Sequence, residues 1–264
     1  MAAYAGLRPF TVITGGSEGI GRALAGEFAR GGHNILLVAR RPGPLALAAA
    51  ELAPTNVKIV TLSADLATAA GCAAIETALL AANAYCDVLV NNAAIGLGGP
   101  FAGQPPADLT TLVSLNVGAL TSLTRQFLPG MLSRGQGGIL NVSSLGGYIP
   151  GPRQAAYYAS KAYVTSLSEA LAQETAGQGV RISALVPGPV ATKYHARVGT
   201  EHAYYLGLLG VASPELVARL AYRGFRSGRI VIYPGILQLA NAIVLRILPH
   251  WLSVPAINWM LKPR

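Results

Sequence analysis

Short apolar segments rich in β-branched residues alternate along this chain with longer segments rich in alanine and leucine. The short segments have the length of buried strands, and the longer ones have the length and composition of helices. We therefore predict seven strands, at residues 10–14, 34–39, 57–64, 86–93, 137–144, 180–187 and 229–234. Strands and helices that alternate in this way form a parallel sheet with helices on both faces. The pattern predicts an α/β fold with one doubly wound sheet.

No internal repeat, low-complexity tract or polar linker divides the chain. We predict one main domain over residues 1–234, with a substrate loop near 193–212, followed by an apolar extension over 235–264. The extension contains both tryptophans, Trp251 and Trp259.

The stretch from Ile236 to Leu248 is apolar at nearly every position, and its polar residues fall roughly along one side of a helix. It is shorter than the ~20 apolar residues of a membrane-spanning helix. Such a helix could lie on a membrane surface, close a substrate pocket or cover a subunit contact, and the pattern leaves all three open.

The composition, 52% apolar and 12% charged, excludes a disordered chain. The net charge is +9, but the basic residues do not interleave with aromatic residues along one element, so we expect no nucleic-acid partner. No acidic residue follows Glu215, whereas seven basic residues do: Arg219, Arg223, Arg226, Arg229, Arg246, Lys262 and Arg264. The positive charge belongs to the C-terminal end and suits an anionic membrane surface.

Two features bear on the compartment and on metals. Cys72 and Cys86 have neither CxxC spacing nor a nearby histidine cluster, so we predict reduced structural thiols and no metal site. The first predicted strand begins within about ten residues of Met1, which leaves no room for a secretory signal. We therefore predict a cytoplasmic protein, with membrane-peripheral attachment as the option raised by the extension.

The first strand runs into the sequence TGGSEGIG, in which Gly15, Gly19 and Gly21 precede a helix that begins near Ile20. Glycines let the backbone approach a pyrophosphate closely, and the helix N-terminus offers free N–H groups and a positive dipole end. This context predicts a dinucleotide site of the Rossmann type.

The second strand ends in VARRP, where an acidic residue would bond the ribose 2′-hydroxyl of NAD. Ala39 offers no carboxylate, and Arg40 and Arg41 could bond a 2′-phosphate. The sequence favours NADP(H) over NAD(H), although both arginines could simply be solvated. Asp65, after the third strand, could accept from the adenine amino group or cap the next helix.

Residues 155–163 read AAYYASKAY, with Lys161 four residues after Tyr157 and three after Tyr158. Both spacings bring a tyrosine near the lysine on one helical face, so the spacing alone does not choose between the tyrosines.

Several motifs together resemble the short-chain dehydrogenase/reductase family, in particular its 3-oxoacyl and hydroxysteroid types. The resemblance covers residues 10 to about 190 and rests on TGGSEGIG, Asp65, NNAA (91–94), SLNVGA with Asn116, NVSS (141–144), YYASK (157–161) and VPGPVATK (186–193). In that family the active tyrosine lies four residues before the lysine and thirteen after the active serine. Both counts select Tyr157, and the second pairs it with Ser144 rather than Ser143.

The chemistry of these residues can be argued directly. Reduction of a ketone needs a proton donor, and a phenol with a pKa of about 10 matches neutral pH poorly. We expect Lys161 to lower the pKa of Tyr157 electrostatically and to hold the ribose hydroxyls, and Ser144 to donate to the substrate oxygen. The resemblance implies that Asn116 binds a water that links Lys161 to solvent.

The resemblance also implies a wider cofactor site, with Val190 and Thr192 at the nicotinamide carboxamide. Its predicted members besides Arg40, Arg41, Tyr157 and Lys161 are Gly15, Ser17, Glu18, Gly19, Ile20, Gly21, Asp65, Leu66, Asn92, Ala93, Pro187, Gly188, Val190 and Thr192. Ala94 and Glu18 depart from the family pattern, which usually has a glycine and, in many NADP-using members, a basic residue. The family further implies a homodimer or homotetramer formed through a helix at about 106–132 and the helix of Tyr157, with Tyr158 and Tyr163 in packing or subunit contacts.

Three segments past the strand ends, 96–101, 145–152 and 193–212, are apolar or aromatic. Tyr148, Tyr194, Tyr204 and Tyr205 could shape a pocket for a bulky apolar carbonyl compound or alcohol, whereas Arg153, His195 and Arg197 are expected to be isolated surface residues. The sequence thus predicts an NADP(H)-dependent ketoreductase or alcohol dehydrogenase. Its alternatives are a non-catalytic NADP(H)-binding scaffold or sensor, and a membrane-peripheral protein that acts through its extension.

Overall fold

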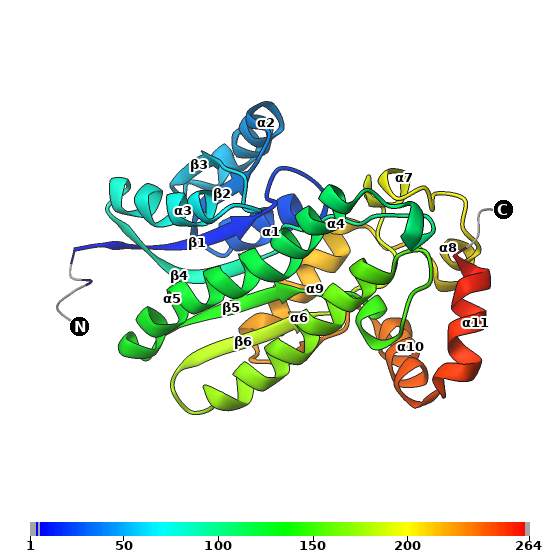
Figure 1. Ribbon diagram of the computed structural model, residues 1–264. Coiled ribbons are helices and arrows are strands. Elements are labelled where there is room, and N and C mark those ends of the chain that lie inside the picture. The colour runs from blue at the N-terminus through cyan, green and yellow to red at the C-terminus, as the bar shows by residue number, and fades with distance from the viewer. Residues whose placement is uncertain (1–3, 5, 262–264) are drawn as a thin grey trace.

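The computed structural model describes residues 4 and 6–261, and it contains one sheet of seven parallel strands. The strands are β1 (Arg8–Thr14), β2 (Asn34–Ala39), β3 (Ile59–Ser63), β4 (Ala84–Asn91), β5 (Gly137–Val142), β6 (Val180–Leu185) and β7 (Val231–Ile232). Their order across the sheet is β3-β2-β1-β4-β5-β6-β7 (Figure 1). The predicted doubly wound fold with seven strands is confirmed.

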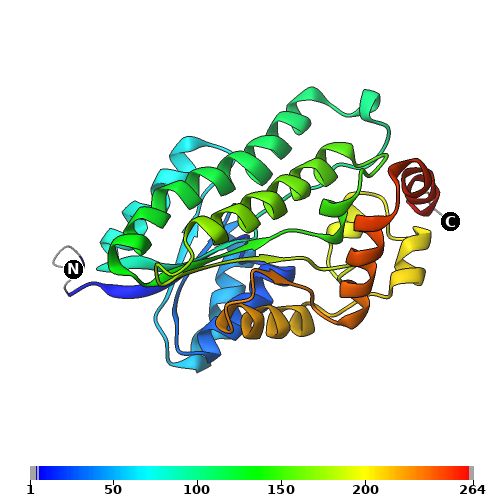
Figure 2. The ribbon, with the colours of Figure 1, turned by 90° about the horizontal axis from the view of Figure 1, so that it is seen from below.

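Helices cover both faces of this sheet. They are α1 (Gly19–Arg30), α2 (Pro42–Leu52), α3 (Ala69–Ala81), α4 (Pro106–Val113), α5 (Leu120–Arg134), α6 (Ala155–Glu174), α7 (Tyr194–Arg197), α8 (Tyr204–Leu209), α9 (Pro214–Arg226), α10 (Ile236–Ile247) and α11 (His250–Met260). Figure 2 shows α5 and α6, in green, on one side of the sheet and α9, in gold, on the other.

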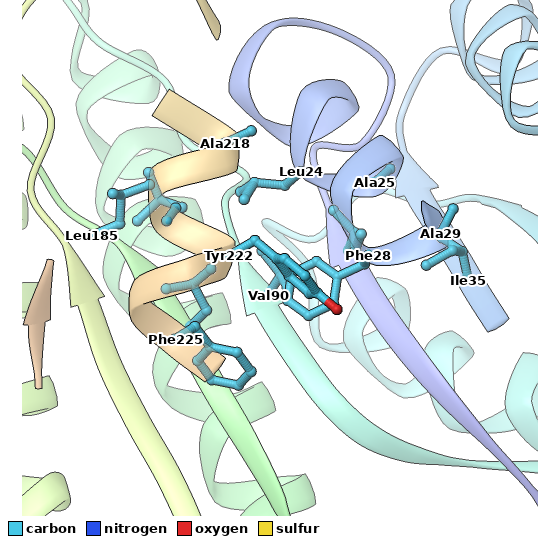
Figure 3. Close-up of a cluster of buried hydrophobic side chains, with 14 of the residues drawn as sticks. Leu24, Ala25, Phe28, Ala29, Ile35, Val90, Leu185, Ala218, Tyr222 and Phe225 are labelled. Atoms are coloured by element: carbon cyan, nitrogen blue, oxygen red, sulfur yellow. The ribbon is translucent and has the colours of Figure 1, made fainter. Parts of the chain in front are cut away.

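Alternate strand residues face opposite layers, as the period of a strand requires. On one face, Ile13 of β1 joins a buried cluster with residues of α1, α2 and α9, and on the other Val12 joins a cluster with residues of α3 and α5. The ring of Phe28 lies 4.9 Å from that of Tyr222, where α1 meets α9 (Figure 3). Both layers are apolar because nearly every residue of the central strands is buried.

Two elements differ from the prediction. Strand β7 pairs through two residues only, and Pro234, which has no N–H to donate to the ladder, follows after Tyr233. The helix expected at about 106–132 is present as α4 and α5, but a π-helical segment, Ser114–Ala119, separates them. Asn116 lies in this segment, and such irregular turns are frequent at functional sites.

The extension after β7 forms α10 and α11, and Ala242 of α10 packs into a small cluster with Leu145, Ala184 and Val186. Within the described residues, no helix combines the length and the apolar character needed to cross a bilayer. Cys72 and Cys86 are buried and form no disulfide. Lys262 and Arg264, counted among the basic residues of the extension, lie outside the described residues. A domain boundary at residue 234 stays a prediction.

Candidate active site

The glycine loop between β1 and α1 forms a tight cradle. Gly15 has a φ of +64°, which favours glycine, and a Cβ at Gly21 would lie 2.3 Å from both the Asn92 Nδ2 and the Gly15 oxygen. Asn92 holds the loop by donating from Nδ2 to the carbonyl oxygens of Thr14 (2.9 Å) and Gly15 (3.1 Å). No side chain caps the N-terminus of α1, so its free N–H groups remain open to an anion.

A cavity of about 1190 Å³ runs from this loop along the carboxyl ends of the strands. It is lined by Ser144, Tyr157 and Lys161 and, from the predicted cofactor set, by Gly15, Ser17, Glu18, Gly19, Ile20, Asn92, Ala93, Pro187, Gly188, Val190 and Thr192. Residues of the cofactor and catalytic sets that do not line it are Gly21, Arg40, Arg41, Asp65, Leu66 and Asn116. An uncapped helix end, a cradle too narrow for side chains and a long cavity together fit a dinucleotide.

Tyr157 lines the cavity, and its hydroxyl interacts with the hydroxyls of Tyr194 and Ser144. Burial raises its pKa to about 12, while hydrogen bonding with Tyr194 and Ser144 acts in the opposite direction. The lowering of this pKa expected from Lys161 is therefore wrong: burial raises the pKa, and the groups that act against burial are the Tyr194 and Ser144 hydroxyls. The phenol stays protonated at neutral pH, which is the form that can donate a proton.

Lys161 is buried beneath Tyr157. Its ammonium lies 5.6 Å from the centroid of the Tyr157 ring and donates to the carbonyl oxygen of Val142 at 2.7 Å. Burial lowers the pKa of Lys161 to about 8, so the group still carries most of its positive charge at neutral pH.

The two neighbouring serines of NVSS have different surroundings. Ser143 is buried; its hydroxyl donates to the carbonyl oxygen of Lys161 (2.8 Å) and bonds the Thr165 hydroxyl (2.6 Å). Ser144 lines the cavity, and its hydroxyl accepts only from the amide of Gly146 (3.1 Å) and acts on the pKa of Tyr157. Ser144 thus lies beside Tyr157, whereas the hydrogen bonds of Ser143 link the end of β5 to α6.

Tyr158 also lines the cavity, and its ring lies against Gly146 and Gly151, at 6.1 Å from the ring of Tyr157. Burial raises the pKa of Tyr158 as well. Tyr163 is 38% exposed, and its hydroxyl bonds that of Thr121, which joins α6 to α5. The subunit contacts predicted for these tyrosines stay a prediction.

The Asn116 side chain is fully engaged. It donates to the carbonyl oxygen of Ile95 (2.9 Å) and to the Ser160 hydroxyl (3.1 Å), and it accepts from the amide of Ile95 (2.9 Å). It therefore fixes the segment after β4 to the π-helical turn and to α6. The water relay implied for Asn116 stays a prediction.

Tyr194, the first residue of α7, lies next to Tyr157, although the two residues are far apart in the sequence. Its ring lies 5.0 Å from that of Tyr157, and its hydroxyl donates to Gln154 Oε1 at 2.8 Å. Gln154 is buried and was not among the predicted site residues. Its position three residues before Tyr157 was the available signal, because a polar side chain there precedes the first turn of α6.

The other tyrosines of the substrate segments divide into two pairs. Tyr194 and Tyr205 line the cavity, whereas Tyr148 and Tyr204 do not. The Tyr148 hydroxyl bonds that of Tyr233 (2.8 Å), and the Tyr204 ring stacks on Trp259 (4.8 Å between centroids). The expected wall of four tyrosines is thus wrong for Tyr148 and Tyr204, because each packs against the C-terminal part of the chain.

The expectation that His195 and Arg197 are isolated is also wrong, although Arg197 is exposed as predicted. His195 lines the cavity, and its Nδ1 bonds the Tyr205 hydroxyl at 2.8 Å. Arg197 forms an ion pair with Glu18 in the glycine loop. This pair links segments 179 residues apart, so no local pattern could have revealed it.

Glu18 is the centre of a charge cluster. Besides Arg197 it contacts Arg41 (2.9 Å) and Lys193 (3.7 Å), so it joins the glycine loop, the end of β2 and the substrate segment. Burial alone would raise the pKa of Glu18, but the three cations lower it below its usual value. Arg41, predicted to bind a 2′-phosphate, is paired with this carboxylate, while Arg40 is exposed beside it.

Asp65 lies in the turn after β3, where its carboxylate accepts from the amide of Ala67 at 3.1 Å. The cap of α3 is Thr68, whose hydroxyl accepts from the amide of Gly71 at 3.0 Å. The helix-capping alternative for Asp65 is therefore wrong. Leu66 is buried in the core cluster under α3.

Comparison with known proteins supports the fold and the motifs. The short chain dehydrogenase family profile matches residues 9–203. Very-long-chain 3-oxoacyl-CoA reductase from Bos taurus is 34% identical over 192 residues, 71% of this chain and 61% of that protein. The chain spans about 60% of the length of the curated relatives it matches.

Two solved structures cover more of the chain. A short-chain dehydrogenase from Sphingobium yanoikuyae in complex with NADPH is 32% identical with a TM-score of 0.79, over 91% of this chain and 96% of that one. A short chain dehydrogenase/reductase from Burkholderia phymatum in complex with NAD is 27% identical with a TM-score of 0.79, over 90% and 93%. Because the matched profile covers well over half of the chain, this protein belongs to the short-chain dehydrogenase/reductase family.

Proposed function

We propose that this protein is an NADP(H)-dependent reductase that converts a ketone on an apolar substrate to a secondary alcohol. One observation carries the proposal: the Tyr157 phenol, the Ser144 hydroxyl and the Lys161 ammonium converge on one cavity that begins at the glycine loop. A protein that only binds the dinucleotide has no use for a buried proton donor beside a second hydroxyl.

Each of the three side chains has a distinct part in the reaction. The bound nicotinamide supplies the hydride for the carbonyl carbon. Ser144 donates a hydrogen bond to the carbonyl oxygen and stabilises the negative charge that grows there. Tyr157 gives that oxygen its proton, and the nearby ammonium of Lys161 stabilises the phenolate that remains.

The hydrogen bond from Lys161 to the Val142 carbonyl oxygen fixes the ammonium near the Tyr157 ring, where it can stabilise the phenolate. We also assign it to the ribose hydroxyls, as the family resemblance implies. In the direction of alcohol oxidation the same residues act in reverse, with the Tyr157 phenolate as the base.

For the cofactor we propose NADP(H) rather than NAD(H). No acidic side chain stands at the end of β2, and Arg40 and Arg41 follow there. Arg41 exchanges the Glu18 carboxylate for the 2′-phosphate on binding, since the pair is largely exposed and weak. The test is the ratio of kcat/KM for NADPH to that for NADH: replacement of both arginines by alanine should lower it about ten-fold or more. An unchanged ratio would remove the assignment.

For the substrate we propose a bulky apolar carbonyl compound. Besides the cofactor set, the cavity is lined by Leu145, Tyr205 and Leu209, while the polar His195 and Gln154 are occupied by bonds to Tyr205 and Tyr194. An apolar wall with a few polar groups at the reacting end recognises shape rather than charge. We also expect a homodimer or homotetramer in solution, formed through α4, α5 and α6.

The decisive experiment measures ketone-dependent oxidation of NADPH over a panel of apolar ketones, with Tyr157→Phe and Tyr158→Phe as a matched pair. Loss of the proton donor should lower kcat by about 10²–10⁴-fold in Tyr157→Phe. Tyr158→Phe should keep turnover, because the hydroxyls that bond Tyr157 are those of Ser144 and Tyr194 and not that of Tyr158. Equal turnover in the two variants would overturn the mechanism, and NADPH binding without turnover of any ketone would favour the scaffold alternative.

A further inference from the structure

The outer surface of α10 and α11 is apolar. Seventeen large hydrophobic side chains are exposed in the part of the chain that the structure describes, and ten of them lie in these two helices and the turn between them. We call these ten the C-terminal apolar patch: Ile236, Leu237, Leu239, Ile243, Val244, Ile247, Leu248, Trp251, Leu252 and Trp259. Figure 1 and Figure 2 both show α10 and α11 together at one end of the molecule, beside α8.

The polarity of α10 is inverted relative to an ordinary surface helix. Ala242 is buried, and the polar Gln238 faces Gly188 and Gly235 of the domain. Ile236, Ile243 and Ile247, which share one helical face, are 87%, 49% and 75% exposed. Leu245 also packs against the cluster of Ala242, but most of the large apolar side chains of α10 face outward, as on a helix whose apolar side meets something other than its own domain.

Both tryptophans belong to the patch. Trp251 is 75% exposed and Trp259 is 53% exposed, and an indole combines a large apolar body with one N–H donor. Tryptophan is enriched at the boundary between lipid chains and water for this reason. Two helices of 12 and 11 residues are too short to span a bilayer but can lie in its surface.

The charge around the patch distinguishes a lipid surface from a second copy of the chain. No acidic residue lies between 216 and 264. The acidic neighbour across from α10, Glu169 of α6, is already paired with Arg246 at 2.9 Å, and His250 is exposed between the helices. This pairing leaves little net charge on α10 itself, so the charge that opposes a second copy and complements an anionic bilayer is that of the whole segment after Glu215, which holds seven basic and no acidic residues.

The patch also adjoins the reacting cavity. The Trp259 ring stacks on Tyr204 with an interplanar angle of 15°, and the next residue, Tyr205, lines the cavity. Gln238 of α10 lies against Gly188, which lines the cavity as well. If the patch binds a lipid bilayer, the cavity lies close to the bilayer, in which apolar carbonyl compounds dissolve.

We propose that the C-terminal apolar patch docks on the surface of an anionic lipid bilayer, with α10 and α11 lying in the interface. The attachment is reversible and peripheral. It does not depend on the proposed reaction, because the patch contains none of Ser144, Tyr157 and Lys161.

The test is flotation of the full chain with vesicles of phosphatidylcholine that contain phosphatidylserine, and with vesicles of phosphatidylcholine alone. The variant is Ile247→Glu combined with Trp251→Glu, and the matched control is Leu80→Glu, which places a carboxylate at an exposed leucine of α3. We expect the wild type and the control to float with the anionic vesicles and to bind the neutral ones less. The double variant should lose roughly ten-fold or more in partitioning, with an unchanged melting temperature.

Binding of the double variant at the wild-type level would overturn the proposal, as would failure of the wild type to bind anionic vesicles. Equal binding to neutral vesicles would overturn the anionic preference. A change of oligomeric state in the double variant, measured by light scattering, together with absent vesicle binding by the wild type, would assign the patch to a second copy instead. NADPH-dependent turnover of a water-soluble ketone is a separate readout, so failure of the proposed reaction and failure of lipid binding are distinguishable.

Discussion

Replacement of Gly21 by alanine tests how the glycine loop is held. A Cβ at this position would lie 2.3 Å from the Asn92 Nδ2 and 2.3 Å from the Gly15 oxygen, while ordinary contacts begin near 3.4 Å. Asn92 or the loop must therefore move by about 1 Å, the difference between these distances. That movement breaks one or both of the hydrogen bonds that Asn92 donates to Thr14 and Gly15.

Gly26 offers a matched control on the same helix, because the nearest atom to its Cβ would be the mobile guanidinium of Arg30 at 3.5 Å. Both replacements gain the same helix propensity, up to about 1 kcal/mol. The difference between them isolates the cost at Asn92, about 1–3 kcal/mol at most, because this amide is only partly buried when it loses its partner. Gly21→Ala should therefore melt several degrees below Gly26→Ala.

The cofactor gives a second readout of the same change. A shift of about 1 Å in the cradle should raise the Kd for NADPH about ten-fold or more in Gly21→Ala, whereas Gly26→Ala should keep the wild-type value. Thermal unfolding and NADPH fluorescence titration measure the two effects. Equal melting temperatures and equal Kd values for the two variants would refute the account of the loop given above.

Three further predictions follow from the site. Ser144→Ala should lower kcat about 10²-fold with little loss of stability, whereas Ser143→Ala should keep turnover and lose about 1–2 kcal/mol of stability; the reverse pattern would exchange their roles. Burial lowers the pKa of Lys161 from 10.5 to about 8. Between these two values the unfolded chain keeps a proton on Lys161 that the folded chain releases. The free energy of unfolding therefore rises with pH over this range. Urea unfolding between about pH 8 and pH 10 should show the wild type gaining about 1–2 kcal/mol relative to Lys161→Met, and parallel curves would contradict the shift. Glu18→Gln frees Arg41 and should lower the KM for NADPH about two- to five-fold while leaving that for NADH unchanged; an equal change for both cofactors would speak against Arg41 as the phosphate ligand.

The strands follow from the sequence because strand and helix periods fix the alternation of elements. The spacing to Lys161 leaves Tyr157 and Tyr158 open, and the choice of Tyr157 with Ser144 comes from the counts of four and thirteen residues that the family resemblance supplies. The cradle likewise follows from three glycines after the first strand.

Contacts between distant segments could not be predicted in the same way. The Glu18–Arg197 pair and the Tyr194–Gln154 bond depend on the path of the segment after β6 and on side-chain rotamers, which no local pattern specifies. The direction of the Tyr157 pKa shift also depends on depth of burial: the nearby Lys161 in the sequence indicates a lowering, but desolvation raises the pKa, and the lowering groups are the Tyr194 and Ser144 hydroxyls. The π-helical turn at Asn116 has no recognised signal in SLNVGA.

The reacting side chains and the C-terminal apolar patch occupy separate stretches of the chain. The residues that form the cradle and the proton donor all precede α8, whereas the patch begins after β7, which pairs with the sheet through only two residues. The two stretches nevertheless touch, because Trp259 stacks on Tyr204 and Gln238 lies against Gly188, which lines the cavity. An engineer who exchanges the last two helices between relatives should therefore keep these two contacts, so that only the outward-facing surface is replaced.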